Sequence, residues 1–134
     1  ELNSSLMSGK LKQTLCDKFG VKCDGLSEET LLIRDKKGYK IGPHTDRIDK
    51  VITVLFYLPK DGSNIEAGTS LYKSKNGFTC KGGPHYNFKE FNKVKTVPFK
   101  PNSMLAFLKS DKSFHGVETV LKTRDVLLYD IRRL

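Results

Sequence analysis

The sequence lacks long hydrophobic runs, internal repeats and paired cysteines, and each absence excludes a class of protein. Its longest apolar stretch, residues 51–58, is of strand length and far below the ~20 residues of a membrane-spanning helix, so we expect no membrane partner. The three cysteines, Cys16, Cys23 and Cys80, cannot all pair internally and none forms a C-x-x-C motif, which favours reduced thiols. Because residues 1–5 also lack the basic and apolar regions of a signal peptide, we expect a cytoplasmic protein.

Acidic residues are also scarce relative to basic ones. The chain has 24 Lys and Arg against 15 Asp and Glu, a net charge of +9, and its lysines are scattered along the whole length. A positive field favours acidic partners such as nucleic acid, an acidic protein or an anionic cosubstrate, although it also suits a solvated surface. The charge therefore indicates a kind of partner without naming one, and no pattern in the sequence indicates the oligomeric state.

The length of 134 residues is enough for one domain with a modest core, and we expect residues 1–134 to form it. Within it, residues 1–24 are expected to form a helical support and residues 30–133 the core. One amphipathic helix is predicted over residues 4–19. Leu11, Leu15 and Phe19 recur there at intervals of four, and a glycine follows as a stop signal.

From about Thr30 onward, short β-rich segments alternate with turn residues. A helix followed by about eight short antiparallel strands predicts a mainly β fold, a double-stranded β-helix of the jelly-roll or cupin-like type. The glycine-rich residues 62–83 are expected to form a mobile loop beside a site. The predicted strands are residues 30–34, 39–46, 50–58, 69–73, 93–99, 104–108, 115–119 and 124–132.

His44 and Asp46 stand two residues apart in a predicted strand, so their side chains should share one face and could bind one cation. His115 lies near the start of a later strand, which a closed roll can bring opposite His44. Two imidazoles and one carboxylate on one side of a metal form the facial triad of non-haem Fe(II) oxygenases, with positions left open for a cosubstrate and O2. The same ligands could also hold a hydrolytic zinc.

Arg124, nine residues after His115, favours the oxygenase over the zinc hydrolase. It begins the side of a strand that continues with the apolar residues Val126 and Leu128. An arginine on such a face needs an anion, and a dicarboxylate that chelates iron at one end would offer its distal carboxylate.

Four segments together resemble the 2-oxoglutarate/Fe(II)-dependent oxygenase superfamily, and within it the prolyl-4-hydroxylase-like branch. They are residues 31–46, which end in His44-Thr-Asp46, and residues 51–59, 68–72 and 101–118. The resemblance covers about residues 30–133, and the order His-x-Asp, His, Arg is specific to the superfamily. It implies that His44, Asp46 and His115 bind iron and that Arg124 binds the C5 carboxylate of 2-oxoglutarate.

The resemblance also implies a carboxylate-binding tyrosine on the strand after His-x-Asp, and Tyr57 stands at the matching place. Many prolyl hydroxylases carry a second tyrosine about ten residues before the first histidine. Here that position is Arg34, which we expect to contact the cosubstrate, and the nearest tyrosine is Tyr39. This departure bears on the prolyl substrate more than on the cosubstrate. His85 is expected to be a loop histidine and not a ligand.

The implied reaction is hydroxylation of an unactivated C–H bond, coupled to oxidative decarboxylation of 2-oxoglutarate to succinate and CO2. Fe(II) and O2 are the further requirements, and ascorbate is a candidate addition to them. A prolyl residue of a protein or peptide is the favoured substrate. Nucleic-acid demethylases of this superfamily carry an arginine six residues after the first, where this chain has Asp130, so nucleic acid is not favoured. A small metabolite as substrate remains open, as does a non-catalytic jelly-roll binding module.

Overall fold

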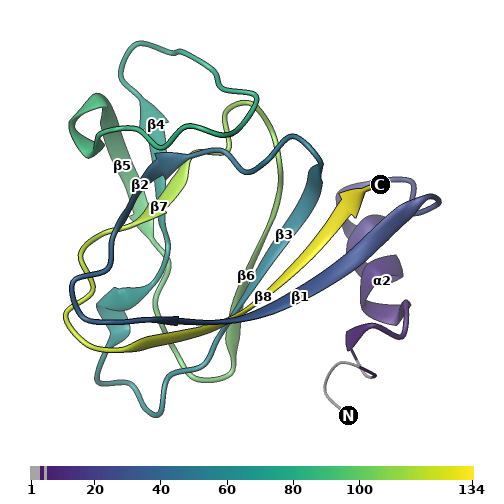
Figure 1. Cartoon of the computed structure of the whole chain (residues 1–134), viewed down its shortest axis with the longest axis horizontal. Coiled ribbons are helices and arrows are strands. Elements are labelled where there is room, and N and C mark those ends of the chain that lie inside the picture. Colours follow the sequence, from purple (N-terminus) through teal and green to yellow (C-terminus); the bar gives the residue numbers. More distant parts are fainter. Residues whose placement is uncertain (1–3, 5) are drawn as a thin grey trace.

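The computed structural model describes residue 4 and residues 6–134, and it consists of two facing antiparallel sheets with a helix on the outer side of one of them (Figure 1). Position 5, inside the predicted helix, lies outside the described residues. In chain order the elements are α2 (Lys10–Phe19), β1 (Leu26–Asp35), β2 (Ile41–His44), β3 (Lys50–Tyr57), η1 (Ile65–Ala67), β4 (Ser70–Ser74), η2 (Phe88–Glu90), β5 (Phe91–Thr96), β6 (Ser103–Leu108), β7 (His115–Val117) and β8 (Arg124–Arg133).

Each sheet has four strands, and the chain passes repeatedly between the two sheets. The first sheet has the order β1-β8-β3-β6 and the second the order β2-β7-β4-β5. The longest pairing joins β1 to β8 over ten residues, from Leu26 opposite Arg133 to Asp35 opposite Arg124. This is the mainly β, two-sheet architecture with a short N-terminal helix that the strand pattern predicts.

The N-terminal helix is shorter than predicted. Helix α2 begins at Lys10, because Gly9 has φ +86° and leaves the right-handed region, so residues 4–19 do not form one helix. It ends as predicted at Phe19, with Gly20 in the left-handed conformation. Its buried residues, Leu15 and Cys16, pack against the outer face of the first sheet. They form one core cluster with the sheet residues Val51, Ile52, Val54, Tyr129 and Ile131.

Two predictions near the site, one for a strand and one for a loop, differ from the structure. Strand β2 ends at His44, so Asp46 lies in the following connection, and alternation within one strand does not place it. Residues 62–83 do not form one loop, because they contain η1 and β4. Strand β1 also begins at Leu26 instead of Thr30, since its pairing with β8 continues to that residue.

The central strands β3 and β8 separate a helix-facing surface from an inner surface. In β3, Ile52 and Val54 face the helix, while Thr53 and Leu55 line the space between the sheets. In β8, Val126 lines the same space. Among the described residues, no helix is long and apolar enough to cross a membrane.

Candidate metal centre and cavity

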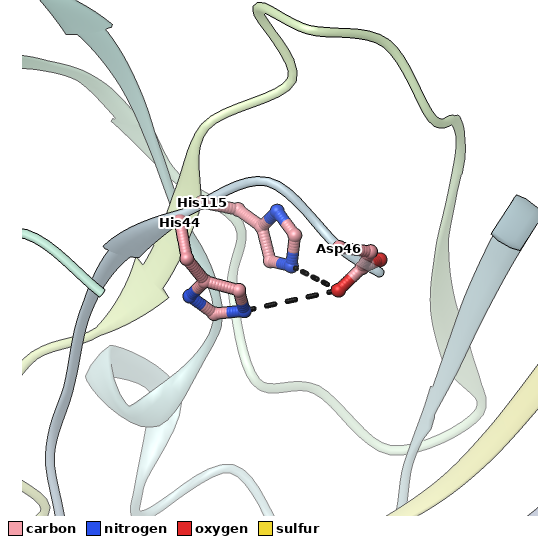
Figure 2. A group of neighbouring side chains, drawn as sticks. All are labelled: His44, Asp46 and His115. Atoms are coloured by element: carbon pink, nitrogen blue, oxygen red, sulfur yellow. Dashed lines mark ion pairs between the residues drawn. The ribbon is translucent and has the colours of Figure 1, made fainter. Parts of the chain in front are cut away.

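His44 and His115 are brought together by direct strand pairing. His44 is the last residue of β2 and His115 the first of β7, and the two are partners in the antiparallel ladder of the second sheet. Their ring centroids lie 4.4 Å apart. Asp46 follows two residues after His44, and Figure 2 shows its carboxylate turned toward both imidazoles. The three residues that the sequence predicts as ligands therefore converge.

The distances between the ligand atoms are suited to one ion. Asp46 Oδ1 lies 3.4 Å from His115 Nε2 and 3.8 Å from His44 Nε2 (Figure 2). The ligand atoms of these three residues all lie within 4.8 Å of one another, and they form the one group of this kind among the described residues.

Both imidazoles are held in the tautomer that a metal requires. His44 Nδ1 lies 2.9 Å from the carbonyl oxygen of Gly42, and His115 Nδ1 lies 2.9 Å from that of Ser113. A carbonyl can only accept, so each Nδ1 carries the proton and each Nε2 presents a lone pair. Such a hydrogen bond from the second ring nitrogen is the usual support of a metal-binding histidine. The donor set therefore fits a divalent cation of the kind bound by two imidazoles and a carboxylate.

The carboxylate of Asp46 is also fixed in place. Thr53 Oγ1 donates a hydrogen bond of 2.6 Å to Asp46 Oδ2, which leaves Oδ1 toward the imidazoles. Burial opposes ionisation of this carboxyl group, yet the neighbouring His115, Lys50 and Thr53 together hold its pKa well below the usual range. Asp46 is therefore an anion at neutral pH, as a metal ligand must be.

His44 is neutral at physiological pH in the metal-free protein. Burial lowers its pKa to about 4, and the nearby His115 and His85 add to this effect, against the opposing influence of Gly42 and Asp46. A neutral imidazole offers its lone pair without first losing a proton, so this environment favours metal binding.

Residues 80–86 pack tightly along the strand that carries His44. Tyr86 N–H donates to Pro43 O at 2.9 Å, and Thr45 Oγ1 donates to Cys80 O at 2.8 Å. This segment places the exposed ring of His85 4.7 Å from that of His44. His85 is outside the ligand group. The contact of its ring with that of His44, at an interplanar angle of 50°, was not foreseeable, because no local pattern links residues so far apart.

A cavity of about 200 Å³ extends from the metal site between the sheets. This is a small volume, suited to a metabolite rather than a large ligand. Its lining combines apolar side chains with charged ones. Its lining comprises Ile33, Asp35, Tyr39, Ile41, His44, Asp46, Lys50, Thr53, Leu55, Thr69, His115, Gly116, Val117, Arg124, Val126 and Leu128.

Arg124 is buried in the wall of this cavity, with only 4% of its surface exposed. Its Nη1 donates to Asp35 Oδ2 at 2.7 Å, its Nη2 to Thr69 Oγ1 at 3.2 Å and its Nε to the carbonyl of Ala67 at 2.5 Å. The structure thus places Arg124 on the same cavity as the metal ligands, as the sequence predicts. Asp35 is a cavity residue that sequence reasoning missed; its one signal was its position opposite Arg124 once β1 pairs with β8.

The structure places Arg34 and Tyr57, the other two predicted cosubstrate contacts, outside the lining of this cavity. Arg34 points away from the cavity and pairs with Asp125 at 2.8 Å, with 67% of its side chain exposed, because its neighbour Asp35 takes the inward position. Tyr57 faces inward but lies behind the cavity wall, where its hydroxyl accepts the Thr69 N–H at 3.2 Å. The tyrosine that does line the cavity is Tyr39.

The buried charges of Asp35 and Arg124 both affect the pKa of Tyr39. Its pKa is raised, first by burial and then by Asp35, while Arg124 acts in the opposite direction. The phenol is therefore protonated at neutral pH and can donate a hydrogen bond into the cavity.

No protein-family profile and no curated protein matches the sequence. Among solved structures, a prolyl-4-hydroxylase from Pseudomonas putida superposes with a TM-score of 0.59 at 18% identity, over 95% of this chain and 63% of the other. A 2OG-Fe(II) oxygenase family oxidoreductase from Burkholderia pseudomallei gives 0.59 at 20% identity, over 99% and 55%. A Phytophthora capsici prolyl 4-hydroxylase structure gives 0.61 at 18% identity, over 98% and 42%.

The chain thus spans 42% to 63% of the length of these three structures. At identities of 18% to 20%, the likeness is one of fold. It agrees with the double-stranded β-helix that the strand pattern predicts, and with the observed pair of facing antiparallel sheets. The chain therefore has the jelly-roll fold of prolyl 4-hydroxylase and 2OG-Fe(II) oxygenase structures.

Proposed function

We propose that the chain is an Fe(II)- and 2-oxoglutarate-dependent dioxygenase that hydroxylates an unactivated C–H bond. The observation that carries the proposal is the convergence of His44, Asp46 and His115 on a small cavity whose wall also contains Arg124. A hydrolytic zinc site would need the three ligands but gives no reason for a buried arginine beside them. The fold likeness to oxygenase structures supports the same reading.

Each residue has a defined part in this proposal. His44, Asp46 and His115 hold the Fe(II) ion, with Thr53 and the two backbone carbonyls keeping them oriented. Arg124 binds the distal carboxylate of 2-oxoglutarate, and the apolar side chains of the cavity lining exclude water from the bound molecule. Iron supplies the oxygen chemistry that couples decarboxylation of 2-oxoglutarate, to succinate and CO2, to hydroxylation of the substrate.

We further propose a prolyl residue of a protein or peptide as the substrate. Two of the three similar structures are prolyl 4-hydroxylases, which supports a peptide over a small metabolite. The net charge of +9 suits an acidic peptide. It would also suit nucleic acid. However, nucleic-acid demethylases of the superfamily have a second arginine where this chain has Asp130, and Asp130 is buried and paired with Lys50 at 2.9 Å.

Metal and cosubstrate binding test the enzyme proposal directly. Under anaerobic conditions, Fe(II) and 2-oxoglutarate should together produce a weak visible charge-transfer band in the wild-type protein. On admission of O2, iron-dependent succinate should follow. His44→Ala should abolish both signals in a folded protein, whereas His85→Ala, a matched change of the neighbouring non-ligand histidine, should retain the band. A folded wild-type protein that gives neither band nor succinate is not a 2-oxoglutarate oxygenase.

The substrate is tested separately, with a library of proline-containing peptides analysed by mass spectrometry. We expect a gain of one oxygen atom that requires 2-oxoglutarate and is lost in His44→Ala. Succinate formation without any modified peptide would direct the search to metabolites and nucleic acid. Binding of ligands with no turnover under any condition would favour a non-catalytic jelly-roll module instead.

A further inference from the structure

The arginine assigned to 2-oxoglutarate already has a carboxylate partner inside the protein. Arg124 Nη1 and Asp35 Oδ2 are 2.7 Å apart, and the two side chains are only 5% and 6% exposed. Both residues line the cavity. A buried, charge-assisted hydrogen bond of this length is among the strong ones in proteins, so the guanidinium is substantially neutralised before any ligand enters.

The guanidinium can still accept a ligand, but only alongside Asp35. A guanidinium has five N–H groups. Three of them are engaged, one each on Nε, Nη1 and Nη2, by Ala67, Asp35 and Thr69. One N–H on each terminal nitrogen remains for a ligand carboxylate. Such a ligand would share Nη1 with Asp35, which brings two carboxylates to one buried cation.

The other cation on the cavity does not relieve this crowding. Lys50 Nζ lies 2.9 Å from Asp130 Oδ2 and 3.9 Å from Asp46 Oδ1, so it is committed to two carboxylates near the metal site. Like charges in a poorly solvated site repel strongly, because little water is present to screen them. The distal carboxylate of a ligand therefore meets an already compensated arginine.

We infer that Asp35 is a specificity-determining residue that weakens the binding of the distal carboxylate of 2-oxoglutarate. The inference rests on the proposed function and deepens it. It assigns to this chain a site in which the second carboxylate contributes little to affinity. The fraction of the protein that holds 2-oxoglutarate then follows the concentration of 2-oxoglutarate, because the site is not saturated. The contrary role for Asp35 is purely to orient Arg124, in which case its charge would aid binding.

Wild-type protein alone provides the first test. Calorimetric titration of the Mn(II)-loaded protein should compare 2-oxoglutarate with 2-oxobutyrate, which has the same chelating end but no distal carboxylate. We expect 2-oxoglutarate to bind less than about tenfold more tightly, below the ratio expected for an uncompensated charge-assisted pair. A preference of a hundredfold or more would overturn the inference.

Asp35→Asn provides the second test, because asparagine keeps an acceptor for Arg124 and removes the charge. We expect binding of 2-oxoglutarate to tighten on the order of tenfold, while binding of 2-oxobutyrate changes less than about twofold. Asp125→Asn is the matched control. It removes the same charge from the residue next to Arg124 in the sequence. Asp125 pairs with Arg34 at the surface, so its replacement should alter the affinity for neither 2-oxo acid.

The outcomes separate the inference from the proposed function. If Asp35→Asn binds 2-oxoglutarate as weakly as the wild-type protein does, or more weakly, Asp35 acts by orienting Arg124 and the inference is wrong, while the oxygenase proposal stands. If neither protein binds either 2-oxo acid although both bind Mn(II), the proposed function fails and the inference falls with it. Binding of 2-oxoglutarate that is detectable only in Asp35→Asn would support both.

Discussion

At the scale of single residues, the candidate site is defined by hydrogen bonds that sort the atoms of each ligand. Each histidine donates a hydrogen bond from Nδ1 to the carbonyl two residues before it. Asp46 accepts a hydrogen bond from Thr53 on Oδ2, the oxygen that faces away from the imidazoles. The ligand atoms are therefore oriented before a metal arrives. Because the side chains are already oriented, they need little rearrangement when the ion binds.

Thr53→Val tests this orientation. Valine keeps the shape of threonine but leaves the buried Asp46 Oδ2 without its 2.6 Å hydrogen bond. We expect the affinity for Mn(II) or Fe(II) to fall by roughly 10- to 100-fold, the range seen when supporting partners of metal ligands are removed. Metal titration followed by calorimetry measures the effect. Thr119→Val changes an exposed threonine in the same way and should leave metal affinity unaltered; an unchanged affinity in Thr53→Val as well would show that the bond does not hold Asp46.

The pKa of His44, about 4 in the folded metal-free protein, predicts how stability depends on pH. In the unfolded chain this imidazole titrates near its ordinary value of about 6.5. As pH falls from 6.5 to 4, the unfolded chain takes up a proton that folded His44 does not, so stability decreases by up to about 3 kcal/mol. Folded Asp46 stays ionised over this window, because its pKa is lowered, and in the unfolded chain it begins to take up protons only near pH 4.

Denaturant unfolding of the metal-free protein at several pH values measures this loss. His44→Asn cannot titrate, so its stability should fall less between pH 6.5 and 4, and the difference between the two proteins is the contribution of His44. Parallel pH profiles for both proteins would mean that His44 protonates as easily folded as unfolded.

The ligands of the candidate site were accessible from the sequence, but their surroundings were not. Residue type and spacing are enough to single out His44, Asp46, His115 and Arg124. Asp35 could not be predicted, because its role depends on the register between β1 and β8, which sets Arg34 outward and Asp35 inward. A shift of one residue would exchange the two, and spacing alone gives no means of choosing between them.

At the scale of secondary structure, alternation and turn residues predicted all eight strands, with errors mainly at their ends. The error that matters is at β2, which stops at His44, where residues 80–86 dock on the chain. This contact joins residues about 40 positions apart, and no local pattern encodes it. Close backbone approach at two glycines makes it possible: a Cβ on Gly42 would lie 2.1 Å from Tyr86 O, and one on Gly82 would lie 2.4 Å from Asp46 O.

Gly42→Ala tests whether this close packing supports the site. Gly42 does not have a positive φ, so the change acts through the 2.1 Å contact with the Tyr86 carbonyl and not through backbone strain. We expect a loss of about 1–3 kcal/mol in unfolding free energy, as for other overpacked sites, together with weaker metal binding. Gly62→Ala is the control, since its Cβ would meet no atom within 4 Å. Thermal unfolding measures the stability of both variants, and metal titration measures their affinity for the ion. Equal stability of the two variants would contradict the role assigned to residues 80–86.

At the scale of the whole molecule, the metal centre lies where the two sheets meet. His44 and His115 belong to the second sheet, whereas Asp46 is hydrogen-bonded to Thr53 on β3 of the first. An ion bound by all three residues would thus link the sheets through Asp46. Arg124 makes a comparable link, because it lies on β8 of the first sheet and binds Ala67 and Thr69, which directly precede β4 of the second.

Metal binding should therefore stabilise the entire fold and not the site alone. A ligand that binds only the folded state adds about 2.7 kcal/mol at a free concentration 100 times its Kd. For a chain of this size we expect Mn(II) to raise Tm by roughly 10 °C, and EDTA to reverse the rise. His44→Ala should show no such rise, whereas His85→Ala should show it in full, because His85 contacts the ring of a ligand without being one. Hydrogen exchange distinguishes a linked fold from a local effect: if Mn(II) protects β2 and β7 but leaves the amides of β3 and β8 unchanged, the ion does not couple the two sheets.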